Sequence, residues 1–299
     1  MERYNSLSNY LKNKFNKKVY KIAINCNFTC PNRDGTKGVG GCIFCSQSGS
    51  GDFAEGGNDV KAQLESAKQR VKNKVPQDAG YIAYFQSFTN TYAEVNRLRK
   101  LYTSALEVED VVALSVATRP DCINDENVAL LGEINKTTPV FVELGLQTAN
   151  QTTADNINRC YQNNDFTLAV EKLRAQNIEV VVHLILGLPG EDENDMLSSV
   201  DFINRHDING VKFHLLHVLK GTRLAKSNYT PLSMSEYFNV LGKCINRLRD
   251  DIIIHRLTGD GDKKILIAPK WSEDKKKVLN SLNKYFKQND IRQAKEYRK

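Results

Sequence analysis

This sequence of 299 residues lacks several features that would place it in a common class of protein. No stretch approaches the ~18 consecutive apolar residues of a membrane-spanning helix, so we expect no membrane partner. The N-terminus, MERYNSLSNYLKNKF, has no apolar run of the secretory type, so we expect a cytoplasmic protein. Neither GxxxxGK nor GxGxxG occurs, which argues against the common phosphate-binding loops.

Charge is distributed unevenly along the chain, whose formal net charge is +7. Residues 263–299 carry +8 and residues 1–21 carry +5, so the segment between them carries −6. An acidic body argues against a uniformly basic nucleic-acid-binding protein. The two basic ends fit either contacts with a polyanionic partner or solvated Lys-rich surfaces, and the charge pattern alone leaves both open.

The composition, with 40% hydrophobic and 26% charged residues, is typical of a chain that buries a sizeable core. Six apolar runs recur at intervals of roughly 30 residues and are rich in Val, Ile and Phe, as buried strands are. We predict strands at Val19–Asn25, Tyr81–Phe85, Val111–Ala117, Val140–Leu144, Glu179–Leu186 and Gly210–Leu216.

Segments with helical spacing of apolar residues lie between these runs. We predict helices at Asp59–Lys74, Ala93–Leu106, Glu126–Ile134, Asp165–Gln176 and Asp192–Arg205. Strands that alternate with helices predict an α/β fold with a parallel sheet, wound either as an open partial barrel or as a doubly wound sheet. In both arrangements the functional site lies at the carboxyl ends of the strands.

The pattern changes after Leu216. There we predict a helix at Met234–Arg249, short strands at Ile252–His255 and Ile265–Ile267, and a basic helix at Glu273–Phe286. We therefore divide the chain into a basic N-terminal helix and linker (1–19), a core (20–230) and a C-terminal α+β extension with a basic tail (231–299).

The seven cysteines are the most informative residues of the chain. Their odd number and the expected cytoplasmic location argue against a disulfide framework. Four of them, Cys26, Cys30, Cys42 and Cys45, fall within 20 residues directly after the first predicted strand. Such clustering indicates a metal site in a Gly-rich loop, whose backbone N–H groups can approach an inorganic group closely.

Two kinds of metal site fit these cysteines. If Cys26 is a ligand, four thiolates could form a structural zinc site. If Cys26 is not a ligand, three thiolates could hold an iron–sulfur cubane and leave one iron open. The position after the first strand of a βα array is that of an active-site loop, which favours the cluster.

Six segments resemble motifs of the radical S-adenosylmethionine (SAM) superfamily, and in particular of the YtqA/YhcC family, small relatives of the catalytic subunit of Elongator. They are FTCPNRDGTKGVGGCIFC, YFQSFTNTY, VATRPDC, VELGLQT, HLILGLPGE and KFHLLHVLKGT. The resemblance runs from about Tyr20 to Pro269. It implies a partial (β/α)6 TIM-like barrel with short N- and C-terminal extensions.

The resemblance also implies cofactors and ligands. Cys30, Cys42 and Cys45 would hold a [4Fe–4S] cluster, and Cys26 would lie outside the ligand set. The fourth iron would bind SAM, and one electron would cleave SAM to a 5′-deoxyadenosyl radical that abstracts hydrogen from the substrate. The electron would come from a one-electron reductant such as flavodoxin or ferredoxin.

Further residues stand where such a protein contacts SAM. The predicted cofactor-binding residues are Phe44, Gln86, Glu143, Gln147, Arg159 and Gly187. Alternative roles remain open for four of them: an ordinary core position for Phe44, a buried structural ion pair for Glu143, a surface position for Arg159 and a simple turn for Gly187. Polar side chains near strands five and six predict a polar, anionic substrate. They are His183, His214, His217 and Lys220, with Arg119, Asp121 and His255 from other strands.

The resemblance to Elongator's catalytic subunit implies a tRNA substrate. We expect the protein to convert the 5-carboxymethylaminomethyl group of wobble uridine to 5-aminomethyl, with residues 1–21 and 263–299 contacting tRNA. One alternative is a radical SAM enzyme that acts on a small molecule or a peptide. Another is a non-catalytic RNA-binding protein stabilised by zinc or by a cluster.

Overall fold

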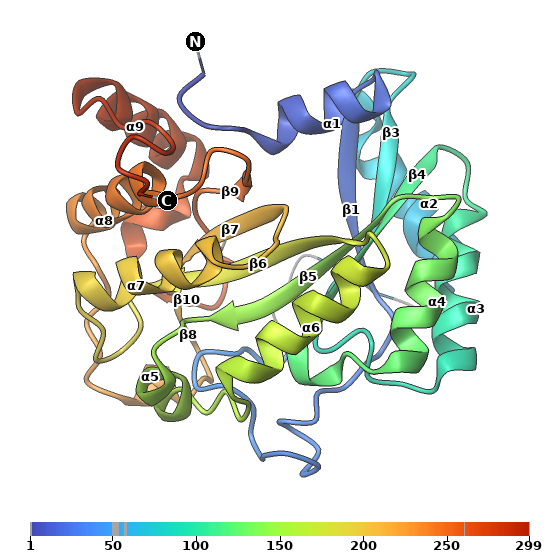
Figure 1. The fold of residues 1–299 in the computed structure, drawn as a ribbon, viewed down its shortest axis with the longest axis horizontal. Helices are drawn as coiled ribbons and strands as arrows, with labels where there is room; N and C mark the ends of the chain where they lie inside the picture. The colour runs from blue at the N-terminus through green and yellow to red at the C-terminus, as the bar shows by residue number, and fades with distance from the viewer. Residues whose placement is uncertain (1, 50–53, 57–58, 260, 299) are drawn as a thin grey trace.

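The computed structural model describes residues 2–49, 54–56, 59–259 and 261–298. Met1 and Lys299, the end residues of the two predicted basic segments, lie outside the described residues. In this part of the chain eight strands form one sheet in the order β2-β1-β3-β4-β5-β6-β7-β9, and all neighbours are parallel (Figure 1). The sheet curls into a half-barrel, so the predicted partial barrel is confirmed.

The strands of this sheet agree closely with the apolar runs. Their bounds are β1 (Val19–Asn25), β2 (Glu55–Gly56), β3 (Gly80–Phe85), β4 (Val111–Thr118), β5 (Val140–Gln147), β6 (Glu179–Leu186), β7 (Gly210–Leu215) and β9 (Ile253–Arg256). A separate antiparallel pair consists of β8 (Val218–Leu219) and β10 (Leu266–Ala268). The short β9, predicted as part of the C-terminal extension, extends the main sheet beyond β7.

Helices cover the outer face of the sheet because one side of each carries the apolar residues of the main core. They are α2 (Val60–Val71), α3 (Val95–Leu106), α4 (Asp125–Asn135), α6 (Asn163–Ala175), α7 (Glu193–Asn204) and α8 (Met234–Arg247). Helix α9 (Lys275–Gln288) packs on α8. A short helix that the sequence pattern did not predict, α5 (Gln151–Asn156), follows β5. No helix in the described ranges is both long and apolar enough to cross a membrane.

Helix α1 (Leu7–Phe15) closes the amino-terminal end of the half-barrel, at the top of Figure 1. Its buried Leu11 packs against side chains that point inward from the first half of four strands. These are Ile82, Ala113, Phe141 and Val181. Since strand residues alternate in direction, the next inward position on each strand forms the layer above this apolar plug.

The two ends of the chain lie side by side. Arg3 forms an ion pair of 3.4 Å with Asp290, and the backbone N–H of Gln293 donates to the Arg3 carbonyl over 2.9 Å. Trp271 packs against Tyr237 with ring centroids 5.9 Å apart. This aromatic side chain of the basic tail therefore packs on the fold.

Candidate functional site

A cavity of about 1040 Å³ runs through the interior of the half-barrel. Its carboxyl-end wall includes Cys30, Cys42 and Cys45. Its other end is lined by the N-terminal segment around Ser6 and by Lys275 of α9. The cavity thus connects the loop after β1 with the place where the two chain ends meet.

The cysteine loop folds back on itself through backbone hydrogen bonds. The N–H groups of Lys37 and Gly38 donate to the Pro31 carbonyl over 2.8 and 3.1 Å, and Cys45 N–H donates to the Cys42 carbonyl over 3.1 Å. The fully buried Asn32 donates to the Asn158 carbonyl over 2.5 Å and lies 3.7 Å from the Cys42 sulfur. These contacts fix the loop to the segment between α5 and α6.

Gly38 is required where the loop meets this segment. A Cβ atom there would lie 2.4 Å from Asn32 Oδ1 and 2.9 Å from the Cys160 sulfur, closer than real Cβ contacts. Only the absence of a side chain lets the backbone pass at this point. Steric crowding therefore explains why glycine occupies position 38 of the Gly-rich loop.

The donor set of the loop suits an iron–sulfur cluster. Cys30, Cys42 and Cys45 are only partly buried and face one cavity, as ligands of an inserted group must. Burial, together with the nearby Cys45 and Cys30 thiols, raises the pKa of the Cys42 thiol to about 12. Thiolates crowded in this way are stabilised by binding cations, and three on one loop leave one iron of a cubane open.

Cys26 has a different environment from the other three cysteines of the loop region. Its side chain is 6% exposed and belongs to the main hydrophobic core together with Phe28. Burial raises the pKa of its thiol to about 12. No three His, Cys, Asp or Glu side chains in the described ranges are placed to hold a single metal ion.

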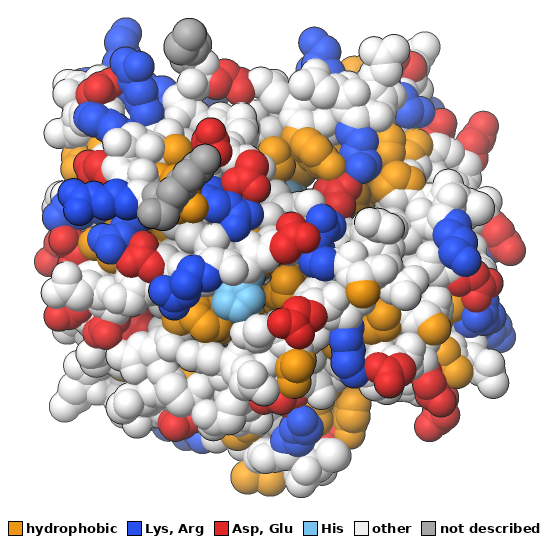
Figure 2. Space-filling model, in the orientation of Figure 1, with side chains coloured by type: hydrophobic (Ala, Val, Ile, Leu, Met, Phe, Trp, Pro, Cys, Tyr) orange, Lys and Arg blue, Asp and Glu red, His pale blue; other side chains and the backbone are white. Residues whose placement is uncertain are grey.

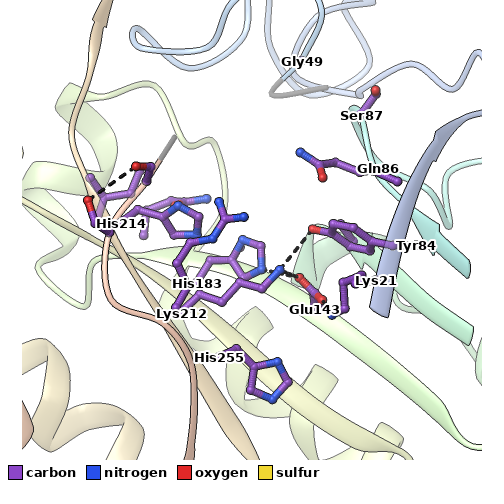
Figure 3. Close-up of a pocket in the computed structure, with 18 of the residues that line it drawn as sticks. Lys21, Gly49, Tyr84, Gln86, Ser87, Glu143, His183, Lys212, His214 and His255 are labelled. Carbon is purple, nitrogen blue, oxygen red and sulfur yellow. Dashed lines mark hydrogen bonds and ion pairs between the residues drawn. The ribbon is translucent and has the colours of Figure 1, made fainter. Parts of the chain in front are cut away.

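The residues that follow β3 combine an unusual backbone conformation with unpaired polar side chains. Ser87 and Phe88 have φ angles of 94° and 59°, in the left-handed region that such residues rarely adopt. The hydroxyl groups of Ser87 and Thr89 are buried, and neither has a hydrogen-bond partner in the described chain. Both residues line the cavity together with Gln86 (Figure 3). Unpaired buried hydroxyls are costly, so this edge of the cavity can offer two hydrogen-bonding groups to a bound molecule.

Three further predicted cofactor-binding residues differ in their positions. Phe44 lines the cavity and packs on the small core around Ile185. Gln147 lines the cavity at the end of β5, with a φ of 70°. Gly187 is absent from the described cavity wall and forms a turn with a φ of 84° that only glycine adopts easily. Their contacts with SAM stay predictions.

Arg159 has a structural environment. Its side chain is 1% exposed and donates to the carbonyls of Leu146, Thr148 and Tyr161 over 2.7–3.3 Å. The guanidinium also donates to the side chains of Gln151 and Asn163. All of its N–H groups thus hold the segment after β5 in place. The predicted contact with the cofactor carboxylate stays a prediction that these bonds do not favour.

Glu143 forms the centre of a buried polar layer. Its side chain is fully buried, and Oε1 accepts from Lys21 Nζ over 2.5 Å and from Ser115 Oγ over 2.8 Å. Oε2 accepts from His183 Nε2 over 2.7 Å and from Lys212 Nζ. Glu143 therefore forms a buried ion pair, which was its alternative role. It lies inside β5, before the carboxyl end of the strand.

The layer takes one inward-facing residue from each of six strands. In strand order they are Lys21, Tyr84, Ser115, Glu143, His183 and Lys212. Figure 3 shows Gln86 and Ser87 on one side of this layer and His255 on the other. The layer lies between the cofactor end of the cavity and the apolar plug under α1.

Burial and mutual charge set the protonation states of the layer. Burial acts to raise the pKa of Glu143, but Lys21 and Lys212 outweigh it and hold the pKa well below its ordinary value. Burial lowers the pKa of Lys212 to about 7, although Glu143 opposes the shift. Burial and the Lys212 charge lower the pKa of His183 to about 4. At neutral pH the carboxylate is therefore charged, the imidazole is neutral and Lys212 is near its midpoint.

The predicted substrate residues are partly brought together. His183, His214, His217, His255 and Arg119 line the cavity, whereas Asp121 and Lys220 are not part of its described wall. Asp121 instead holds Arg119 through two hydrogen bonds of 2.9 Å.

The sequence analysis missed four members of the polar layer, namely Lys21, Tyr84, Ser115 and Lys212. A signal was present, since Lys21 and Lys212 interrupt the apolar runs VYKIAIN and GVKFHLL at single positions. A lysine inside such a run is rarely buried unless it is paired.

A parallel half-barrel with three cysteines on the loop after its first strand defines a class of protein that holds an iron–sulfur cluster at the carboxyl ends of its strands. The family model for the radical SAM superfamily matches residues 24–203, and that for a radical SAM C-terminal domain matches residues 208–288. The chain belongs to the radical SAM superfamily and is an enzyme of that superfamily. Membership implies a [4Fe–4S] cluster and SAM.

Individual relatives support this assignment. The chain is 44% identical over 290 residues to YtqA of Bacillus subtilis (strain 168), covering 95% of this chain and 89% of YtqA. It is 33% identical over 286 residues to YhcC of Escherichia coli (strain K12), covering 94% and 91%. Among solved structures, an N-terminally truncated Elp3 of the archaeon Methanocaldococcus infernus superposes with a TM-score of 0.69 at 17% identity. The match covers 92% of this chain and 64% of the Elp3 chain, less than two thirds, and it supports the fold alone.

Proposed function

We propose that this protein is a tRNA-modifying radical SAM enzyme with a [4Fe–4S] cluster on Cys30, Cys42 and Cys45. Its substrate is wobble uridine, whose 5-carboxymethylaminomethyl group it converts to 5-aminomethyl. SAM would be the oxidant and water the co-substrate, and the two carbons of the carboxymethyl group would leave as glyoxylate. The observation that carries the enzyme class is the placement of these three cysteines on one loop above a large cavity. The substrate is supported by the resemblance to the catalytic subunit of Elongator.

The cluster and SAM, when bound, supply a carbon radical that removes a hydrogen atom from the substrate. The chain's own residues prepare the site for this chemistry. The loop after β1 presents the thiolates, and Ser87 and Thr89 offer hydroxyls without partners in the described chain at the end of β3. Helix α1 closes the far end with Leu11, which limits access of water from that side.

The chain ends support an RNA substrate. The segment around Tyr4 and helix α9 with Lys275 both line one end of the cavity. Figure 2 shows Lys and Arg side chains over α9 and the N-terminal segment at upper left, with a histidine at the centre of the same face. An RNA bound at the chain ends through its phosphates would be anchored next to the cavity, which could accept one unstacked base.

A deletion strain tests the proposal. We expect mass analysis of its tRNA nucleosides to show accumulated 5-carboxymethylaminomethyluridine and lost 5-aminomethyluridine or its derivatives. The wild-type gene should restore the profile, and a Cys42→Ala gene should not. An unchanged wobble-uridine profile would contradict the tRNA step. A one-electron donor such as flavodoxin or ferredoxin completes the proposed system.

A further inference from the structure

The wall of the cavity is strongly cationic, although the sequence between the two basic ends has a net charge of −6. Among the described residues that line it, Glu143 is the one acidic residue, against nine Lys and Arg. The nine are Lys21, Arg33, Arg70, Lys74, Arg119, Arg159, Lys212, Arg256 and Lys275. A cavity with this imbalance attracts an anion.

The cations near the cysteine loop hold other parts of the protein. Arg119 is paired with Asp121, Arg159 donates to carbonyls, and Arg33 donates to the Ser46 carbonyl. Deeper in the cavity two cations have only one anionic partner, because Lys21 and Lys212 both pair with the carboxylate of Glu143. The centre of the half-barrel therefore holds more positive than negative charge.

Each of the two ammonium groups retains a hydrogen-bond donor. Lys21 donates to Glu143 and to Ser115, and Lys212 donates to Glu143 and to Tyr84. An ammonium has three N–H groups, so within the described chain each lysine has one left when it is protonated, the state of Lys212 that a nearby anion favours. Glu143 itself shows the fit, since it offers one carboxylate oxygen to each lysine.

Two imidazole nitrogens beside this layer also have no partner. His214 Nε2 and His255 Nδ1 are buried, and neither forms a hydrogen bond in the described structure. The rings of His214 and His183 lie 5.0 Å apart between centroids. Burial lowers the pKa of both His214 and His255 well below the ordinary value, so each is neutral and can donate one N–H. Buried polar groups of this kind normally have partners, which indicates a ligand.

We propose that the polar layer binds a carboxylate of the substrate, with Lys21 and Lys212 donating to its oxygens and His214, which lies beside His183, contacting the same group. This inference deepens the proposed function and rests on it for the identity of the carboxylate. In that function the group is the terminal carboxylate of the uridine side chain. The same chemistry is present in a free N-alkylglycine, and the experiment distinguishes the two sources.

Binding is measured with the anaerobically reconstituted enzyme and SAM. The RNA probes are two anticodon stem–loops that carry 5-carboxymethylaminomethyluridine or 5-aminomethyluridine at the wobble position. The small probes are N-methylglycine and dimethylamine, which differ by a carboxylate alone, whereas the two RNAs differ by a carboxymethyl group. We expect the enzyme to bind the carboxylate-bearing RNA about tenfold more tightly, the effect of one charge-assisted hydrogen bond of about 1.4 kcal/mol.

The variants Lys21→Met and Lys212→Met test the assignment. Each leaves Glu143 one ammonium partner, so its carboxylate keeps a counter-charge. We expect each to reduce the preference for the carboxylate to less than about threefold. The control Lys243→Met removes a lysine that pairs with Glu193 on the outer helices, and should keep the full preference.

The outcomes separate this inference from the proposed function. Equal affinity for the two members of each probe pair overturns the carboxylate site, and so does a preference that both variants retain. A lysine-dependent preference for N-methylglycine, without any preference between the two RNAs, supports the carboxylate site and contradicts the tRNA substrate. A lysine-dependent preference within the RNA pair supports both.

Discussion

The substitution Glu143→Gln tests the electrostatic account of the cavity. Glutamine has nearly the same shape, but only one of its two terminal atoms accepts hydrogen bonds, because the other is an NH2 group that donates them. On the Oε2 side the change removes the charge-assisted bonds from His183 and Lys212. At about 1.5–3 kcal/mol each, their loss destabilises the protein by about 3–5 kcal/mol, the usual cost of removing one partner of a buried ion pair.

This cost depends on pH in a defined direction. Lys212 has a pKa of about 7 when folded, partly sustained by Glu143, against 10.5 as its ordinary value. In the wild type this group therefore adds stability as the pH rises from 7 towards 10, where the unfolded chain binds more protons. In the Gln variant the pKa of Lys212 falls further. Below pH 7 the folded wild type therefore binds a proton at Lys212 that the folded variant does not bind, and this proton stabilises the wild type relative to the variant. The destabilisation at pH 6 should exceed that at pH 8 by about 1 kcal/mol.

Denaturant unfolding at both pH values measures these differences, with wild type and variant in the same metal-loading state. Trp271 is the single tryptophan and packs in the fold, so its fluorescence follows unfolding. The control Glu193→Gln breaks an exposed pair with Lys243 and should cost about 0–1 kcal/mol at either pH. A cost below about 1 kcal/mol at pH 6, or the same cost at both pH values, would refute the pairing of Glu143 with Lys212.

The remaining predictions concern the cluster loop and its support. Alanine at any of the three cluster cysteines should abolish iron binding after anaerobic reconstitution, whereas Cys26→Ala should retain it, as iron analysis would show. Gly38→Ala should lower iron content because its Cβ meets Asn32 Oδ1 at 2.4 Å. Arg159→Lys should destabilise the protein by about 2–4 kcal/mol in denaturant unfolding through the loss of several buried hydrogen bonds. Unchanged stability would show that those bonds are not what holds the segment.

The fold could be predicted from the sequence because its strands are continuous apolar runs separated by amphipathic helices. The bounds of Val19–Asn25 and Glu179–Leu186 agree with the structure to the residue. The role of β9 could not be predicted in the same way. A four-residue strand carries too little pattern to show whether it joins the main sheet or a separate unit.

The site was predictable only where its residues are close in sequence. The spacing of Cys30, Cys42 and Cys45 carries its own chemical meaning. The polar layer instead takes single residues from six strands, and no local pattern joins Lys21 to Lys212. Summing charge along the chain likewise placed the positive charge at the ends and hid the cationic cavity that folding assembles.

The most direct test of the central claim is the formation of 5′-deoxyadenosine by the anaerobically reconstituted enzyme with SAM, a strong reductant and tRNA that carries 5-carboxymethylaminomethyluridine. The account predicts 5′-deoxyadenosine together with conversion of that nucleoside to 5-aminomethyluridine, and neither product with Cys42→Ala. Wild-type enzyme that holds its cluster, yet forms no 5′-deoxyadenosine and leaves the nucleoside unchanged, would contradict the account.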